Sequence, residues 1–443
     1  MRVAFLAALV LVGTSAAEPL VAQQDTRTQA VTAASTQPRG ASPAAGAPTF
    51  YADVLPVLQQ NCQSCHQAEG KNMGGMVAPF PLVTYQEARR YAGRIADAIR
   101  TGHMPPWSAA EMHRGMFKDE RYLEDEEKQT IFAWVEAGAP AGDPSAAPPP
   151  PDFLTAAAAT GGWSMGEPDL ILSFAEPYCL DDDLRDIYVN IPVQITDEML
   201  PEDKWIESVE YRNGPAVHHI ISSVSGLVPG AEPQDYAEGY GRVMRAGPRE
   251  VMFNMHFNKE PGPGTALCTN IQAGIRFKED GEVIRHVTSG NGLRIRDWSI
   301  PPGDPSYSAS TEYTFEEDVE LLGFMPHMHL RGKAALYEAT YPDGRHETLL
   351  HVPDYDFNWQ HSYDFIEPKL VPAGTVLRFT LWWDNSADNP ANPDPTATVT
   401  WGLPTHAEMS QGYMSFQPLR EVHLVVGDPI PENLTQSEDN EAN

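Results

Sequence analysis

Residues 186–195 read DIYVNIPVQI, a run in which apolar and polar side chains alternate. Alternation with a period of two predicts a β-strand that buries one face. Similar runs recur between turns rich in glycine, proline, asparagine and aspartate: HHIISSV (218–224), AALYEATY (334–341) and TVLRFTLWW (375–383). This pattern is typical of an all-β sandwich.

The β-rich region covers residues 160–427, which is long for one sandwich. The stretch IRDWSIPPGDPSYS (295–308) is the best internal boundary, because proline and glycine interrupt the strand pattern there. We therefore expect two all-β sandwiches, at 160–298 and 299–427. The acidic tail that follows, 428–443, is expected to be disordered.

Residues 48–140 have a helical pattern instead. Thr84 and Glu87 form the sequence signature of a capping box at the start of TYQEARRYAGRIADAIRTG (84–102). A second helix is expected in LEDEEKQTIFAWVEAG (123–138), which is acidic at its start and ends at a glycine. The proline-rich segment after it predicts a semi-rigid linker at 141–159. The expected unit at 48–140 is small and all-α.

The N-terminus reads MRVAFLAALVLVGTSAAEP, with one arginine, a short apolar core and small residues at a cleavage site. This predicts a secretory signal peptide at 1–17, followed by a flexible tether at 18–47. The apolar run is too short to span a bilayer, so no membrane span is expected. The mature protein is therefore predicted to be periplasmic or secreted.

Composition limits the partners of this 443-residue chain. It has 30 lysines and arginines against 61 aspartates and glutamates, a formal net charge of −31. Such a charge repels nucleic acid and anionic membranes.

Of the four cysteines, Cys179 and Cys268 lie far from the other two, and in an oxidising compartment they either pair or remain buried thiols.

The other two cysteines belong to the unit Cys62-Gln-Ser-Cys65-His66. In a C-x-x-C-H unit the thiols bond the vinyl groups of a porphyrin, and the histidine is held beneath the iron. A zinc site would need a second ligand pair nearby, and a thioredoxin-like redox site would need a βαβ setting. The sequence offers neither, so it predicts a covalently attached haem c.

A second axial ligand is available in TGHMPPW (101–107), where Met104 follows the capped helix; Met73 and Met76 compete for this role. The order of helix, C-x-x-C-H, helix, Met-Pro-Pro-Trp and final helix resembles a class I cytochrome c, and especially the short modules fused to exported bacterial enzymes. The resemblance implies an all-α cytochrome c domain over 48–140. Histidine and methionine ligation suits electron transfer.

Histidines and one methionine mark the β region. His218 and His219 are adjacent, and His256 lies in a later strand-like run. Adjacent residues on a strand point to opposite faces, so His218 and His219 could share a metal only through a bulge or twist. His327 and His329 are two residues apart, so on a strand they can coordinate one metal from the same face.

The set HH … NMHF … HMHLRGK … AEM resembles the copper type II, ascorbate-dependent monooxygenases, the family of peptidylglycine α-hydroxylating and dopamine β-monooxygenases. The resemblance covers about 160–425. It implies that His218, His219 and His256 hold an electron-transfer copper. It also implies a catalytic centre whose copper ligands are His327, His329 and Met409 and whose substrate site is lined by Tyr413. A thioether favours Cu(I), which agrees with a redox role.

The resemblance further implies two jelly-roll-like sandwiches of eight strands, each with one copper, facing across an open cleft. Hydroxylation of a C–H bond would use O₂, a small organic substrate and an external donor, either an ascorbate-like reductant or a redox protein. The haem would pass electrons to the three-histidine copper. Because Met325-Pro326 replaces the carboxylate-binding arginine of the peptide enzyme, a glycine-extended peptide is not expected. The alternative is a haem and copper protein that transfers electrons or handles copper without hydroxylating anything.

Overall fold

The structure is a computed structural model whose described residues belong to one compact unit within 44–443. The described residues are 46–67, 78–151, 163–214, 216–227, 233–419, 422–431 and 434. The predicted signal peptide, most of the tether and most of the acidic tail lie outside these ranges, as do Met73 and Met76.

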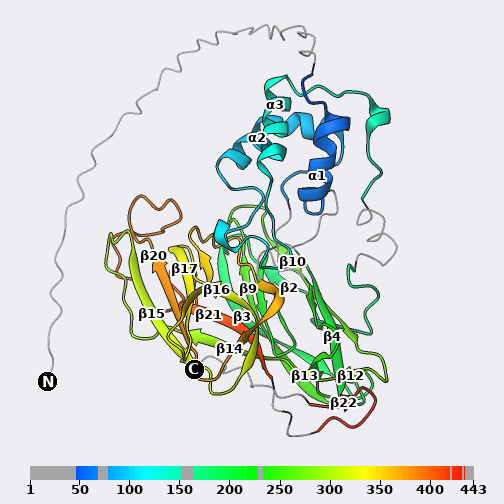
Figure 1. Ribbon diagram of the computed structural model, residues 1–443, viewed down its shortest axis with the longest axis vertical. Helices are drawn as coiled ribbons and strands as arrows, with labels where there is room; N and C mark the ends of the chain where they lie inside the picture. The colour runs from blue at the N-terminus through cyan, green and yellow to red at the C-terminus, as the bar shows by residue number, and fades with distance from the viewer. Residues whose placement is uncertain are drawn as a thin grey trace, which may run out of the picture. The chain divides into compact units, whose positions relative to one another are not determined.

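Helices are confined to the first part of the described chain (Figure 1). They are η1 (Phe50–Val54), α1 (Leu55–Asn61), α2 (Tyr85–Arg100), η2 (Glu111–His113), α3 (Asp125–Glu136) and η3 (Pro144–Ala146). The predicted capping box is confirmed, because the Thr84 side chain accepts from the Glu87 backbone and the Glu87 carboxylate accepts from the Thr84 backbone. Among the described residues, no helix is long and apolar enough to cross a membrane.

The first half of the β region contains two larger and two smaller sheets. The six-stranded sheet consists of β1 (Leu170–Ser173), β11 (Ile271–Phe277), β4 (Lys204–Asn213), β8 (Tyr240–Met244), β13 (His286–Val287) and β7 (Gln234–Asp235). The four-stranded sheet has the order β3 (Asp186–Ile195), β9 (Arg249–Asn258), β5 (Val217–Ile221) and β6 (Gly226–Leu227). Two-stranded sheets pair β2 (Tyr178–Leu180) with β10 (Leu267–Thr269), and β12 (Val283–Ile284) with β22 (Leu424–Val425).

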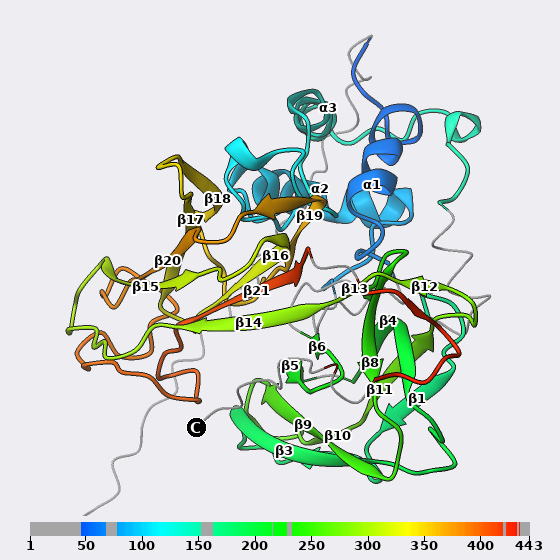
Figure 2. The same cartoon turned by 60° about the horizontal axis from the view of Figure 1, so that its bottom comes forward.

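The second half contains two four-stranded sheets (Figure 2). One has the order β14 (Ser289–Arg294), β21 (Gln411–Pro418), β16 (Val319–His327) and β19 (Tyr363–Val371). The other has the order β15 (Tyr307–Thr314), β20 (Val376–Trp383), β17 (Gly332–Thr340) and β18 (His346–Val352). Each half of the β region has its own apolar core, as the alternating strand sequences predict.

The predicted fold class was wrong. The described chain is mostly β-structure with three α-helices, arranged in six sheets rather than in two eight-stranded jelly-roll sandwiches. The helical segment is also not an all-α cytochrome c domain with its own boundary. Its residues Ala109 and Phe117 are buried in the core of the second β half, together with residues of β16, β17, β19 and β20.

The segment between α2 and α3 is attached to the edge of the β structure. Phe117 forms an isolated antiparallel bridge with Phe365, and their rings lie 5.0 Å apart. Backbone hydrogen bonds join Ala110 to His351 and Lys118 to Asp364. The sequence reveals the helices because their signals are local. It does not reveal this pairing, because the partners lie about 240 residues apart along the chain.

Cys179 and Cys268 form a disulfide, which decides the alternative that the sequence left open. They face each other across the pairing of β2 with β10. The bond closes a loop with a sequence separation of 89, so it removes much conformational freedom from the unfolded chain.

We therefore expect the double substitution Cys179→Ala, Cys268→Ala to lower the free energy of unfolding by about 2–4 kcal/mol. The measurement is urea unfolding followed by tryptophan fluorescence. Wild-type protein under reducing conditions should match the variant, and equal stability of oxidised wild type and variant would contradict the expectation.

Candidate metal centre

The three-histidine set lies on the sheet of β3, β9 and β5. The pairing of β5 with β9 shifts register between Val217 and His219, so His218 is the extra residue of a bulge. This is the distortion that two adjacent histidines need in order to share a metal. His218, His219 and His256 each bring a ligand atom within 4.8 Å of the others.

Asp186 determines which nitrogen of His256 is available. Nε2 of His256 is hydrogen-bonded to the Asp186 carboxylate, so Nε2 carries the proton and Nδ1 keeps its lone pair. Nδ1 of His256 is buried and has no hydrogen-bond partner among the described residues. Nδ1 of His218 and Nδ1 of His219 lie 3.5 Å apart. Buried nitrogen lone pairs without a donor are the environment that a metal ion would complete.

The second set forms where β16 ends. His327 is the last residue of that strand, and His329 lies just beyond it with its ring perpendicular to that of His327 at 5.4 Å. The expected strand therefore covers only the first histidine. Met409 comes from the loop before β21, and its Sδ lies 3.2 Å from Nε2 of His327. The two histidines and the methionine are brought together as the sequence predicted.

Hydrogen bonds also orient this second set. Gln360 donates from Nε2 to the Phe357 carbonyl, which turns its Oε1 toward Nδ1 of His327 at 2.5 Å. Nδ1 of His329 lies 3.4 Å from the Ala407 carbonyl, which can only accept. Both Nδ1 atoms therefore carry protons, and both Nε2 atoms are left as ligands beside the Met409 thioether.

Glu408 connects the methionine to the histidines. Its carboxylate is completely buried and accepts hydrogen bonds from the backbone N–H groups of His329 and Arg331. Burial raises the pKa of Glu408 to about 8, although the two backbone hydrogen bonds and the Arg331 charge oppose the shift. Because both oxygens are engaged, this carboxylate is a positioning group and is not placed to act as a general base.

The two ligand sets are in contact, which differs from the expected arrangement across an open cleft. The rings of His219 and His327 are 5.7 Å apart. Tyr188 lies between the sets, because its ring stacks on His256 at 4.1 Å and its hydroxyl lies 3.4 Å from Nε2 of His329. The described residues thus form one cluster of six potential ligands.

Burial favours the neutral form of all five histidine rings of the cluster. Burial lowers the pKa of His327 to about 4, and it lowers the pKa values of His218, His219, His256 and His329 below their usual range. Neutral imidazole is the form that binds metals. Three nitrogens in one set, and two nitrogens with a thioether in the other, fit copper.

The C-x-x-C-H unit begins at the end of α1. Cys62 and Cys65 take part in no disulfide among the described residues, and Cys62 packs against the helical core. Nδ1 of His66 lies 2.9 Å from the Phe80 carbonyl, so it carries the proton and Nε2 is free to ligate iron. Burial lowers the pKa of His66, which keeps the ring neutral. These residues fit covalent haem attachment, and the described contacts leave the role of Met104 a prediction.

Tyr413 shares a sheet face with the second ligand set. Gln411 is paired with His327 on one side and with Arg294 on the other, so these three side chains point to the same face. Tyr413 lies two residues farther along the same strand and also faces that way. Its proposed role in substrate binding stays a prediction, but it is on the face that the role requires.

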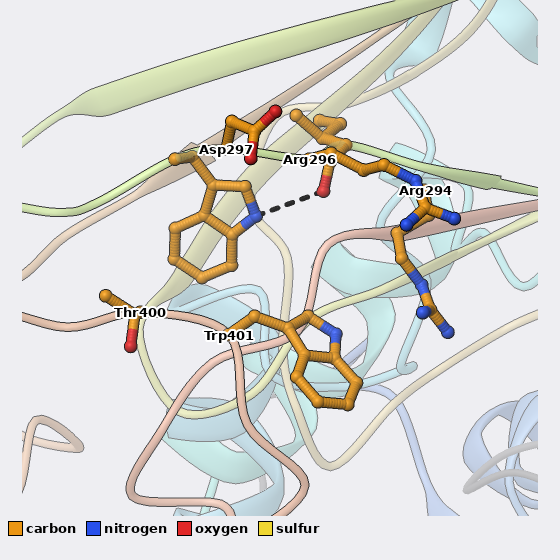
Figure 3. A pocket seen from close by; sticks show the side chains of 7 residues that line it. Arg294, Arg296, Asp297, Thr400 and Trp401 are labelled. Atoms are coloured by element: carbon orange, nitrogen blue, oxygen red, sulfur yellow. Dashed lines mark hydrogen bonds between the residues drawn. The ribbon is translucent and has the colours of Figure 1, made fainter. Parts of the chain in front are cut away.

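An open pocket of about 350 Å³ lies beside this face. Its lining includes Arg294, Arg296 and Trp401, and the Arg294 guanidinium lies 5.2 Å from the Trp401 ring (Figure 3). Trp401 in turn bridges to Glu408, the residue before Met409. An aromatic pocket with two arginines and one aspartate, Asp297, therefore adjoins the second ligand set.

Sequence reasoning missed the groups that orient the ligands: Asp186, Tyr188, Gln360 and Arg331. Arg331 lies within the HMHLRGK stretch but had no role assigned to it, and the other three stand in no recognisable motif. Each of the four acts through a partner that is distant in sequence. The one available signal was the acidic residue before Met409, which the resemblance included without a structural role.

Comparison with known protein families and with curated proteins finds no match. Among solved structures, a two-domain protein of unknown function from Bacteroides fragilis is 10% identical, with a TM-score of 0.18 over 59% of this chain and 98% of its own. The infectious bursal disease virus VP2 subviral particle is 9% identical, with a TM-score of 0.17 over 56% and 71%. PNGF-II is 8% identical, with a TM-score of 0.21 over 58% and 65%. Likenesses this low carry no argument about fold or function.

The orienting hydrogen bonds predict that each ligand set can be weakened separately. We expect Gln360→Leu to weaken copper binding by the His327 set about 10–100-fold, because the ring loses its fixed tautomer. Asp186→Asn, which keeps an oxygen to accept the Thr405 hydrogen bonds but places an amide NH₂ against His256, should weaken the three-histidine set by a similar factor. Titration with Cu(I) in competition with a chromophoric chelator measures both affinities, and each variant serves as the control for the other. An equal loss of copper affinity at both ligand sets in either variant would contradict the idea that the two sets are oriented separately.

Proposed function

We propose that the protein is an exported copper-dependent monooxygenase that hydroxylates a C–H bond of an organic substrate with O₂ and receives electrons through a covalently attached c-type haem. The observation that carries the proposal is the convergence of two three-ligand sets with oriented lone pairs. His218, His219 and His256 would hold one copper ion. His327, His329 and Met409 would hold the other.

When bound, the copper ions would supply one-electron redox chemistry and oxygen activation. The chain's own residues do the positioning. Asp186, Gln360 and Glu408 hold the ligands in place, and Tyr188 fills the space between the two sets. Five of the six candidate ligands are buried and His218 is half-buried, which would limit the access of bulk water to the reacting centre.

Other features of the chain also support export and an external electron donor. The disulfide between Cys179 and Cys268 suits an oxidising compartment such as the periplasm or the exterior. Each turnover needs two electrons, which an ascorbate-like reductant or a redox protein would supply through the haem. The competing function is a haem and copper protein that transfers electrons or handles copper without hydroxylation. A zinc hydrolase is disfavoured because the adjacent carboxylate of Glu408 is engaged by backbone amides.

Metal content tests the proposal first. Mature protein from a host that attaches c-type haem should contain one iron and two copper ions per chain. His327→Ala should contain one copper ion, and His218→Ala should also contain one, from the opposite set. Elemental analysis with the optical spectrum of the haem provides the measurement. Copper at background level in the wild type would refute the monooxygenase.

Oxygen uptake then separates the two functions. A monooxygenase consumes O₂ in a substrate-dependent manner and incorporates one labelled oxygen atom into the product. The non-hydroxylating alternative gives copper and haem redox cycling with no substrate-dependent incorporation.

The pocket beside the second ligand set predicts the kind of substrate. We expect substrates with an acidic group and a flat apolar part, because guanidinium groups pair with carboxylates and the Trp401 ring offers a stacking surface. Arg294→Gln should raise KM for such substrates about 10-fold, the effect of losing roughly 1.4 kcal/mol of binding. Arg378→Gln is the matched control, because Arg378 is paired with Glu312 on the other sheet. An unchanged KM in Arg294→Gln would remove this pocket from the substrate site.

A further inference from the structure

The segment from Phe357 to Tyr363 connects the haem-binding part of the chain with the metal cluster. Gln360 is 1% exposed and His361 is 4% exposed, so both side chains are buried. Neither side chain is one of the potential ligands. Their contacts point in opposite directions. Gln360 reaches the metal cluster, and His361 reaches the Met-Pro-Pro-Trp stretch.

His361 makes the contact with the haem-binding part. Its Nε2 lies 3.0 Å from the Pro106 carbonyl, which can only accept, so the ring donates this hydrogen bond. The His361 ring also lies 5.3 Å from the ring of Trp107. Pro106 is two residues after Met104, the predicted sixth ligand of the haem iron.

Gln360 makes the contact with the cluster. Its Oε1 is 2.5 Å from Nδ1 of His327, and its own Nε2 is fixed by the Phe357 carbonyl. A continuous path therefore runs from Met104 through Pro105 and Pro106 to His361, along one peptide link to Gln360, and on to His327. The non-covalent steps on it are two short hydrogen bonds.

A competing path leads to the three-histidine set. Phe357 stacks on His218 with ring centres 4.4 Å apart. This path, however, crosses a van der Waals gap between two rings. Its backbone route from His361 to Phe357 is also three residues longer than the route from His361 to Gln360. Electronic coupling decays more steeply across such a gap than through covalent and hydrogen bonds. The first path is therefore favoured.

We propose that His361 and Gln360 form the electron path from the haem to the copper held by His327, His329 and Met409, so that electrons from the haem enter at this copper rather than at the three-histidine copper. The proposal rests on the proposed function, because it requires both metal centres. In the step, a ferrous haem gives one electron to a cupric ion and leaves ferric haem and Cu(I). The external donor then reduces the haem again, and no bond is formed or broken.

The test uses the holoprotein with ferric haem and both copper ions oxidised, without oxygen or substrate. A laser flash on a deazaflavin photoreductant reduces a small fraction of the haem, and its reoxidation is followed in the visible band. Loss of the Cu(II) electron paramagnetic resonance signal identifies the acceptor. We expect a reoxidation rate that is independent of protein concentration in the wild type. This concentration-independent phase of haem reoxidation, called the fast phase below, should be retained in His218→Ala and lost in His327→Ala.

A second pair of variants tests the path itself. His361→Phe keeps a ring beside Trp107 but removes the hydrogen bond to Pro106, so reoxidation should become several-fold slower. Trp359→Phe is the matched control, because Trp359 stacks on His361 at 5.7 Å and lies off the path. Its rate should equal that of the wild type. Copper content and the haem spectrum of each variant establish that it is folded and loaded.

The outcomes are distinct. Loss of the fast phase in His218→Ala with retention in His327→Ala overturns the proposed entry point and assigns entry to the three-histidine copper. Equal rates in wild type and His361→Phe overturn the path. Absence of intramolecular reoxidation in a wild type that contains haem and both coppers also overturns the path, but it leaves the monooxygenase intact. Absence of the metals overturns the proposed function together with the path.

Discussion

The buried carboxylate of Glu408 is the constraint on which the metal cluster depends. Leaving a polar group without hydrogen-bond partners in a protein interior is costly, and here the partners are the backbone N–H groups of His329 and Arg331. The Arg331 guanidinium is itself buried and is held by Asn385 and the His406 carbonyl. These bonds force the loop that carries Met409 against the end of β16. The positions of His327, His329 and Met409 thus follow from satisfying one buried carboxyl group.

Asp186 provides the corresponding constraint between the two halves of the β region. One carboxylate oxygen is hydrogen-bonded to His256, and the other accepts from the backbone and side chain of Thr405. Burial on its own would raise the pKa of Asp186, but the bonds from His256 and Thr405 outweigh it and hold that pKa below its usual range. Because Thr405 is four residues before Met409, this aspartate joins a ligand of one set to the loop of the other. The contact between the sets follows from this bridge.

The sequence predicted those features that depend on neighbouring residues. The helix from Tyr85 is capped by Thr84 as expected, and the bulge required by His218 and His219 is present. The candidate ligands could be named from the sequence because histidines and a methionine stand out by type. The fold class was wrong because Phe117, from the segment between α2 and α3, joins the core of the second β half, and this residue has no distinctive local pattern. Gln360 and Asp186 were missed for the same reason, since a glutamine or aspartate acquires its role only from a partner that the fold supplies.

The packing of the segment between α2 and α3 on the β structure also changes how a haem in the helical part would serve a copper centre. A module on a flexible linker meets its partner by diffusion within a limited volume, and the linker sets its effective concentration. Here Phe117 is paired with Phe365, and the Trp107 ring lies 5.3 Å from the rings of both His361 and Tyr363. Burying such aromatic side chains is worth about 1.5–3 kcal/mol for each, so the packed arrangement is favoured over a dissociated one. The proline-rich linker would therefore not be required to bring a haem and a copper site together, because the segment 105–123 already contacts the β structure.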